Sequence, residues 1–117
     1  MKIVNRVRSN KDFTLTIKNG KHFNVPTFHF VSKENDLDRF RVGISVSKKL
    51  GNAVVRNKIK RQIRAMCDGV IDFSKGYDLI IIVKNEYLNN DYHSNLGVLS
   101  DYISNKLGVN KWKKEPR

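Results

Sequence analysis

The stretch from residue 40 to residue 64, FRVGISVSKKLGNAVVRNKIKRQIR, carries the pattern that decides the fold. In residues 40–47 apolar side chains alternate with small or polar ones, which predicts a strand with one buried face. The apolar positions are Phe40, Val42, Ile44 and Val46, and the polar side consists of Arg41, Gly43, Ser45 and Ser47. Gly51 and Asn52 then interrupt the chain, and Asn52 is a suitable N-cap for a helix that begins directly after it.

That helix is predicted to be amphipathic. Its apolar stripe consists of Val55, Ile59, Ile63 and Met66. At 100° per residue the opposite face carries Asn57, Lys60, Arg61 and Arg64, with Arg56 and Lys58 nearer its borders. One helix therefore buries a stripe and exposes a cationic face.

Upstream, Ser9 and Asp12 have the spacing of a capping box, which predicts a short helix over residues 10–19 with Phe13 and Ile17 on one face. Asn19-Gly20 is interpreted as the end of this helix, although the same pair could form a hairpin turn. Residues 23–32 are predicted to form a strand that pairs with the 40–47 strand as a hairpin.

Downstream, residues 79–83 are apolar at every position, as in a strand covered on both faces and paired with parallel neighbours. A last helix is indicated by the stripe Tyr92, Leu96, Leu99, Ile103 and Leu107, and the tail from about residue 110 is expected to be frayed. The order αββαβα predicts an α+β fold with a mixed sheet of four or fewer strands. The 117 residues are expected to form a single domain, 1–117.

The charge balance points to a polyanionic partner. The chain has 23 Lys and Arg against 11 Asp and Glu, a net charge of +12. The excess is concentrated, because the 26 residues from Arg39 to Arg64 include nine basic residues and no acid. Such a patch favours nucleic acid over a merely solvated basic surface. The helix-turn-helix setting typical of DNA-reading helices is lacking, so RNA recognition through phosphates and riboses is favoured.

Several other classes of protein are disfavoured. The lone Cys67 fits a reducing compartment, and no apolar run is long enough to span a membrane, so we expect a cytoplasmic protein without membrane contact. The three histidines are scattered, without metal-ligand spacing. Ser45-x-x-Lys48 matches an acyl-transfer motif, but Ser45 falls in a strand and the companion motifs are missing. We therefore expect neither a catalytic nor a metal site.

The segment 41–64 resembles the signature of the protein subunit of bacterial ribonuclease P almost position for position, and residues 10–20 and 78–83 resemble that family more weakly. The resemblance implies a small αββαβα two-layer sandwich with a left-handed strand-helix-strand crossover. It also implies a cofactor role beside a catalytic RNA. That RNA would hold the Mg²⁺ ions and cleave precursor tRNA at its mature 5′ end. The implied partners are thus this RNA and precursor tRNA, with no obligate protein partner evident.

The resemblance also implies two binding surfaces. The first would contact the catalytic RNA through Lys48, Lys49, Arg56, Asn57, Lys58, Lys60, Arg61 and Arg64. The second, a cleft between the first helix and the sheet, would hold the single-stranded 5′ leader of the substrate with Phe13, Ile17, His29, Val31, Ser45 and Ser47. The strand pattern also assigns these last four residues to a non-core face, although Phe13 and Ile17 could simply belong to the core. A ribosomal or ribosome-assembly protein is the alternative function; a stand-alone nuclease would need a His or carboxylate cluster.

Overall fold

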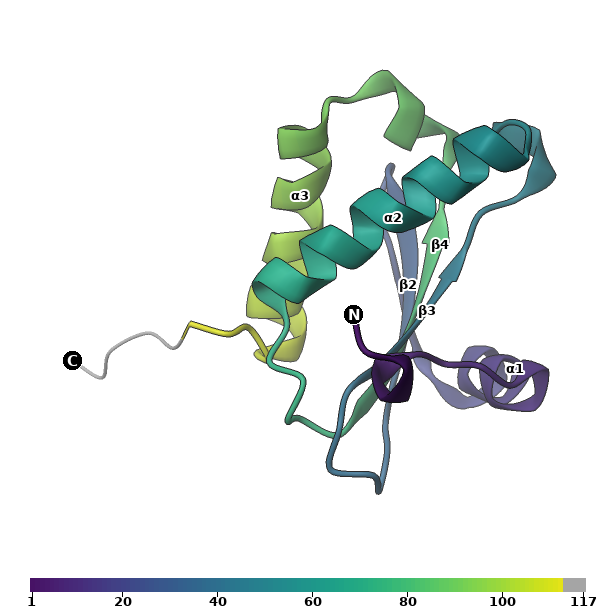
Figure 1. Ribbon diagram of the computed structural model, residues 1–117. Helices are drawn as coiled ribbons and strands as arrows, with labels where there is room; N and C mark the ends of the chain where they lie inside the picture. Colours follow the sequence, from purple (N-terminus) through teal and green to yellow (C-terminus); the bar gives the residue numbers. More distant parts are fainter. Residues whose placement is uncertain (113–117) are drawn as a thin grey trace.

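The protein is described here by a computed structural model that covers residues 1–112. A four-stranded sheet lies between α1 on one side and α2 and α3 on the other (Figure 1). The main elements are α1 (Asn10–Asn19), β1 (Lys21–Asn24), β2 (Phe28–Glu34), β3 (Arg41–Ser45), α2 (Ala53–Val70), β4 (Tyr77–Val83) and α3 (Tyr92–Asp101). Short 3-10 turns occupy Ile3–Asn5, Lys48–Leu50 and Asn85–Asn89, and α3 continues as a π-helix, Tyr102–Leu107. The predicted α+β class with a mixed sheet is confirmed.

The helix starts are capped as the sequence predicts. The Ser9 side chain accepts hydrogen bonds from the backbone N–H groups of Lys11 and Asp12, and Asn52 accepts one from Val55. The α1 helix ends before Gly20, whose N–H bonds to the carbonyl of Thr16. The interpretation of Asn19-Gly20 as a helix end is therefore correct.

The order of the strands differs from the prediction. The sheet runs β1-β2-β4-β3, so the expected hairpin between the 23–32 and 40–47 strands is wrong. β4 lies between β2 and β3, antiparallel to β2 and parallel to β3, so only one of its two neighbours is parallel. The physical reason is burial: the most apolar strand gains most from an interior position in the sheet.

The predicted strand over 23–32 is itself a hairpin. β1 and β2 pair with each other in the register Lys21↔Ser32, and the turn between them contains Pro26. Proline has no N–H to donate to a ladder, so the strand is interrupted there.

The crossover from β3 through α2 to β4 is left-handed. In Figure 1 both strands run upward, α2 crosses in front of them, and β4 lies to the left of β3. This agrees with the handedness that the family resemblance implies, against the usual right-handed rule.

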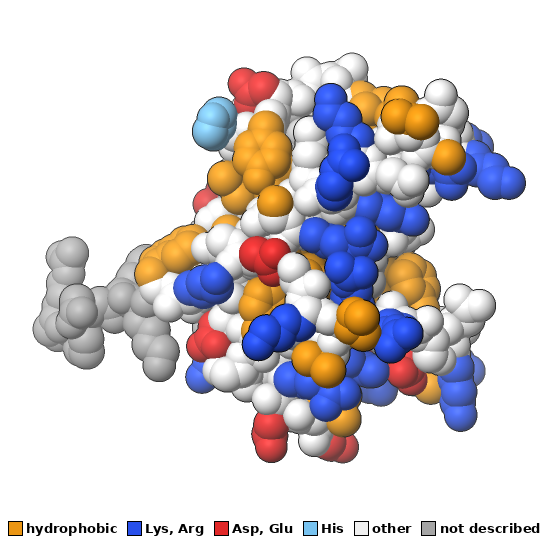
Figure 2. All heavy atoms as spheres, in the orientation of Figure 1, with side chains coloured by type: hydrophobic (Ala, Val, Ile, Leu, Met, Phe, Trp, Pro, Cys, Tyr) orange, Lys and Arg blue, Asp and Glu red, His pale blue; other side chains and the backbone are white. Residues whose placement is uncertain are grey.

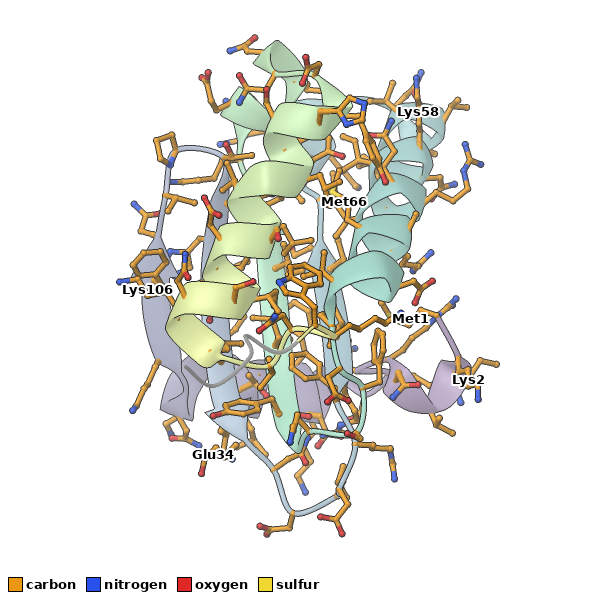
Figure 3. All side chains as sticks on the ribbon, turned by 90° about the vertical axis from the view of Figure 1, so that its left-hand side faces the viewer. Met1, Lys2, Glu34, Lys58, Met66 and Lys106 are labelled. Carbon is orange, nitrogen blue, oxygen red and sulfur yellow. The ribbon has the colours of Figure 1, made fainter. Side chains whose placement is uncertain are left out.

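The main core lies between the sheet and α2 and α3. It includes Phe28, Phe30 and Ile81 from the strands and Ile63 and Leu99 from the helices. Figure 3 shows Met66 directed inward from α2, whereas Lys58 extends away from the core. The last helix buries Leu99 and Ile103 and packs Leu96 and Leu107 against the same core, but it leaves Tyr92 37% exposed, so the predicted stripe holds except at its first residue.

The expectation of a frayed tail from about residue 110 falls partly on residues 113–117, which lie outside the described residues. Within the described part, Asn110 forms a bridge with Ile71, and the Lys111 N–H donates to the carbonyl of Val70.

Candidate nucleic-acid interface

The outward face of α2 is cationic. Ile59, Ile63, Met66 and Cys67 are buried beneath the helix, whereas Asn57, Lys58 and Arg61 are exposed on its other side. Figure 2 shows Lys and Arg side chains along this helix and below it toward the N-terminal segment. Arg56, Lys60 and Arg64 are half-buried, as expected for side chains whose stems pack while their charged ends reach solvent. The predicted division of the helix into a buried stripe and a cationic face is confirmed.

One basic residue of the 39–64 segment is neutralised by residues distant in sequence. The Arg41 guanidinium donates to both carboxylate oxygens of Asp78, at 2.8 and 2.6 Å, and to Asp12 at 3.1 Å. These bonds raise the pKa of Arg41, mainly through Asp78, although partial burial acts in the opposite direction. Arg41 therefore ties α1, β3 and β4 together and adds nothing to the free cationic surface.

A second cluster of arginines surrounds a pocket at the β3 edge of the sheet. The pocket, of ≈ 360 Å³, is lined by Ile3, Arg6, Val7, Arg8, Phe13, Val42, Gly43, Ile44 and Arg64. Arg64 has its pKa lowered, first by burial and then by the positive charge of Arg6. The Nε of Arg6 is buried without a hydrogen-bond partner. An anion in this pocket would relieve the repulsion between the two guanidinium groups.

The α1 side of the sheet has two rows of side chains that differ in exposure. Register places Val31, Ile80 and Gly43 in one row and His29, Ile82 and Ser45 in the next. Val31 and Ile80 are fully buried, whereas all three residues of the second row are half-buried. The second row therefore forms a partly exposed surface of the sheet beside α1.

Gly43 allows α1 to approach the sheet closely. A Cβ at this position would lie 2.8 Å from the Ile80 side chain and 3.2 Å from the Phe13 ring. Phe13 thus packs over the glycine, and it is only half-buried because its ring also lines the arginine pocket. The ring is both a packing group and part of an accessible surface.

The structure brings some of the predicted cleft residues together and separates others. Phe13, Ile17, His29 and Ser45 are half-buried beside α1 or on the open row. Val31 is 0% exposed and supports the cleft from beneath without reaching its surface. Ser47 lies beyond the end of β3 and is exposed next to Lys48 and Lys49.

Three residues of these surfaces escaped prediction from the sequence. Arg6 and Arg8 precede the first helix in a segment without periodicity, and only the fold brings them to the pocket that Arg64 lines. Ile82 was expected to be covered because its whole strand is apolar, yet it belongs to the open row. Sequence alone could have indicated the two arginines only through their charge.

Neither a metal cluster nor a membrane-spanning helix accompanies these surfaces in the described part of the chain. Within residues 1–112 no group of three or more His, Cys, Asp or Glu side chains is arranged to hold a metal ion. Over the same residues, no helix is long and apolar enough to cross a membrane.

Comparison with known proteins gives a consistent result. The family model described as Ribonuclease P matches residues 1–105. The ribonuclease P protein component of Streptococcus agalactiae is 43% identical over 94 residues, covering 80% of this chain and 86% of that protein. The ribonuclease P protein component of Mesoplasma florum is 41% identical over 101 residues, covering 83% of this chain and 90% of that protein.

Solved structures agree in fold. A mutant of the Staphylococcus aureus RNase P protein with defective mRNA degradation activity superposes with a TM-score of 0.78 at 32% identity, covering 91% of this chain and 90% of that one. The Thermotoga maritima RNase P protein in complex with 1-(4-fluorophenyl)-2-thiourea has a TM-score of 0.76 at 33% identity. The match covers 86% of this chain and 98% of that one.

Proposed function

The chain belongs to the ribonuclease P protein family, and on that premise we propose that its two surfaces bind two different RNAs of one ribonucleoprotein. As a member of that family it is the protein subunit of ribonuclease P, a tRNA-processing endoribonuclease in which the protein alone is not the catalyst. The finer assignments concern the RNA partners, the residues that contact them and the Mg²⁺ ions.

The outward face of α2 binds the catalytic RNA subunit. The observation that carries this assignment is the row of cationic side chains on a helix whose other face is buried. Each Arg presents a planar fork of donors to phosphate oxygens, and each Lys supplies a point charge. The contacting residues are Lys48, Lys49, Arg56, Asn57, Lys58, Lys60, Arg61 and Arg64.

The cleft between α1 and the sheet receives the 5′ leader of precursor tRNA. Its half-buried aromatic and apolar groups, Phe13, Ile17 and Ile82, suit unstacked bases, and His29 and Ser45 supply polar contacts beside them. Arg6 and Arg8, which line the pocket at the β3 edge, suit the phosphates of the same strand. Val31 supports the cleft from beneath, and Ser47 would extend the contact surface beyond the end of β3.

The Mg²⁺ ions needed for cleavage are assigned mainly to the RNA subunit. Asp12 on α1 and Asp78 on β4 both bind Arg41, so these two carboxylates already have a cationic partner. The protein lowers the Mg²⁺ requirement instead, because its cations reduce the repulsion between two polyanions. Precursor tRNA is made in the cytoplasm of bacteria, which is where the complex would act.

A Mg²⁺ titration with protein alone, catalytic RNA alone and both together tests this function. Cleavage at the mature 5′ end should require high Mg²⁺ with RNA alone and low Mg²⁺ once protein is added, with none from protein alone. Cleavage by RNA-free protein, or a protein effect that tightens the binding of mature tRNA as much as that of precursor tRNA, would overturn the assignment. Copurification with ribosomal RNA in place of one RNA of a few hundred nucleotides would favour ribosome assembly.

A further inference from the structure

A pocket lies where the N-terminal half of α2 meets the Asn85–Asn89 turn and the start of α3 (Figure 1). Its volume is ≈ 300 Å³, at the lower end of the ~300–1,000 Å³ typical of ligand pockets. Three large apolar side chains that line it are exposed: Val54 at 76%, Leu88 at 51% and Tyr92 at 37%. Single exposed apolar residues are normal on a protein surface, but a group of them at one pocket indicates a partner.

A buried hydrogen-bond acceptor belongs to the same pocket. Asn95 lines it from α3 and is 1% exposed. Its Nδ2 donates to the backbone oxygen of Tyr87 at 3.1 Å, which fixes the orientation of the amide, because the reverse orientation would bring two oxygens together. The remaining amide atom, Oδ1, is buried and accepts no hydrogen bond from the described residues. Buried polar atoms are nearly always hydrogen-bonded, so a donor that enters the pocket would satisfy this oxygen.

Tyr87 holds two walls of the pocket in place. Its hydroxyl donates to Oε1 of Gln62 on α2 at 2.8 Å, and its backbone oxygen accepts the bond from Asn95 on α3. Tyr87 is 4% exposed, and its ring packs edge-on against Phe28 in the core. The pocket is therefore largely preformed, which reduces the cost of ordering side chains when a ligand binds.

The charge around the pocket favours an anionic partner. Of the described residues that line it, Lys58 alone is charged, and Lys58 is exposed on the cationic face of α2. Figure 2 shows hydrophobic side chains on both sides of a column of Lys and Arg side chains at the upper end of the molecule. Apolar groups beside cations suit an unstacked base that is attached to a phosphate backbone.

We propose that this pocket holds one unpaired base of the catalytic RNA, an inference that rests on the RNA contact proposed above for α2. The base lies against Tyr92 and Leu88, and its phosphate lies beside Lys58. An N–H group of the base donates to Oδ1 of Asn95. The contact recognises one nucleotide, whereas the cations of α2 recognise phosphates irrespective of sequence, so the pocket fixes the position of α2 along the RNA.

The recessed position of Asn95 selects among the bases. The amino group of adenine, cytosine or guanine projects beyond the edge of its ring and can reach a recessed acceptor. The N3–H group of uracil lies between two carbonyl oxygens, which would repel Oδ1 of Asn95 before the N–H group reached it. The pocket therefore takes an amino-bearing base and disfavours uracil.

NMR titration of the full-length protein with CMP and with UMP tests the pocket. The two nucleotides carry the same phosphate, but cytosine has an amino group at C4 where uracil has a carbonyl. We expect CMP to shift the Asn95 side-chain amide and the Tyr92 ring resonances saturably, and UMP to bind there about fivefold more weakly. Tyr92→Ala should weaken CMP binding about tenfold. Leu37→Ser is the control, because Leu37 is 39% exposed and lies outside the pocket, and it should leave CMP binding unchanged.

The complex with the catalytic RNA provides a second measurement. Acylation of RNA 2′-hydroxyls should reveal one unpaired adenosine, cytidine or guanosine that the wild-type protein protects and that becomes reactive again with Tyr92→Ala. The log–log salt slope of RNA binding should stay the same in this variant, because the α2 cations are intact. Circular dichroism should show that the variants are folded.

The pocket and the function proposed above fail separately. Failure of the α2 contact with RNA would appear as an unchanged salt slope when Arg61 and Arg64 are both changed to Ala, with CMP still bound to the free protein. The base pocket is overturned if CMP and UMP shift Asn95 alike or not at all, or if Tyr92→Ala leaves every nucleotide as reactive as with wild type. Shifts with an acidic, aromatic peptide but not with CMP would overturn it in favour of a protein partner.

Discussion

At the scale of single residues, Arg41 shows how a contact between distant residues changes what a side chain does. In the sequence it belongs to a segment that has no acid, so it counts as part of the basic patch. In the fold Asp78 and Asp12 approach it from β4 and α1. The guanidinium is 15% exposed and the Asp78 carboxylate 8%, so this ion pair is shielded from water and serves to join elements.

Replacing Arg41 should therefore affect stability. Arg41→Ala leaves the buried Asp78 carboxylate without its charge partner and should lower the free energy of unfolding by about 3 kcal/mol. Urea denaturation measures this. Asp12→Ala is the comparison: the Asp12 side chain is 39% exposed, so its removal should change stability by under about 1 kcal/mol. Equal effects of the two substitutions would contradict this account of the pair.

Phe13 offers a second prediction for a single residue, in the cleft proposed to bind the leader. If its ring stacks on a leader base, Phe13→Ala should weaken binding of precursor tRNA by about 1–3 kcal/mol and leave binding of mature tRNA nearly unchanged. Leu15→Ala on the same helix, at a position 38% exposed, should change neither affinity. A large fall in Tm with equal losses for both RNAs would assign Phe13 to packing alone.

At the scale of elements, α2 combines two functions on opposite faces. Its inner face carries Ile63 and Cys67, both 0% exposed, and its outer face carries cations. The helix is long enough, at 18 residues, to cross the sheet and still present its charged side chains along one line. Packing therefore holds the side chains proposed to bind RNA in a fixed array.

The outer face of α2 should act through phosphate neutralisation. Changing Arg61 and Arg64 together to Ala should weaken binding of the catalytic RNA and reduce the log–log salt slope by about one to two units. Filter binding across a salt series measures both quantities. Lys75→Ala, an exposed cation outside this helix, is the control, and an unchanged slope in the double variant would show that the face stays solvated in the complex.

The inner face of α2 can be probed through its cysteine. Burial raises the pKa of the Cys67 thiol to about 12, so at neutral pH the reactive thiolate is almost absent. A thiol reagent should therefore react slowly with the native protein and rapidly in denaturant, which absorbance records directly. Rapid reaction under native conditions would mean that α2 opens easily from the sheet.

At the scale of the whole molecule, a net charge of +12 on 117 residues opposes compactness. Arg6 and Arg64 are an instance of this repulsion, because they face one pocket, where burial and then the charge of Arg6 lower the pKa of Arg64. The free protein is thus destabilised at the sites where RNA phosphates are proposed to bind.

Anions should consequently stabilise the fold. Phosphate or sulfate should raise Tm more than chloride at equal ionic strength, because an ion that binds only the native state shifts the folding equilibrium. Thermal unfolding monitored by circular dichroism measures the difference. Arg6→Gln should reduce the extra rise in Tm that phosphate or sulfate gives over chloride, whereas Lys75→Gln should leave it unchanged. Equal Tm values in phosphate, sulfate and chloride would argue against an anion pocket.

Local rules were sufficient for many features of the fold. The caps at Ser9 and Asn52, the end of α1 at Gly20 and the two faces of α2 depend on side-chain chemistry and periodicity within one element, which the sequence contains directly. The charge of the segment 39–64 likewise indicates a polyanionic partner from composition alone. The family resemblance supplied the left-handed crossover, which no local rule would predict.

Tertiary structure alone decided which strands are neighbours and which side chains meet. The insertion of β4 between β2 and β3 places His29, Ile82 and Ser45 in one row and brings Asp78 to Arg41. The hydrogen bond between His22 and His29 likewise requires the β1–β2 register. Periodicity reports which face of a strand is buried but carries no information about its partners, since the pairing of distant strands depends on the burial gained by the whole sheet.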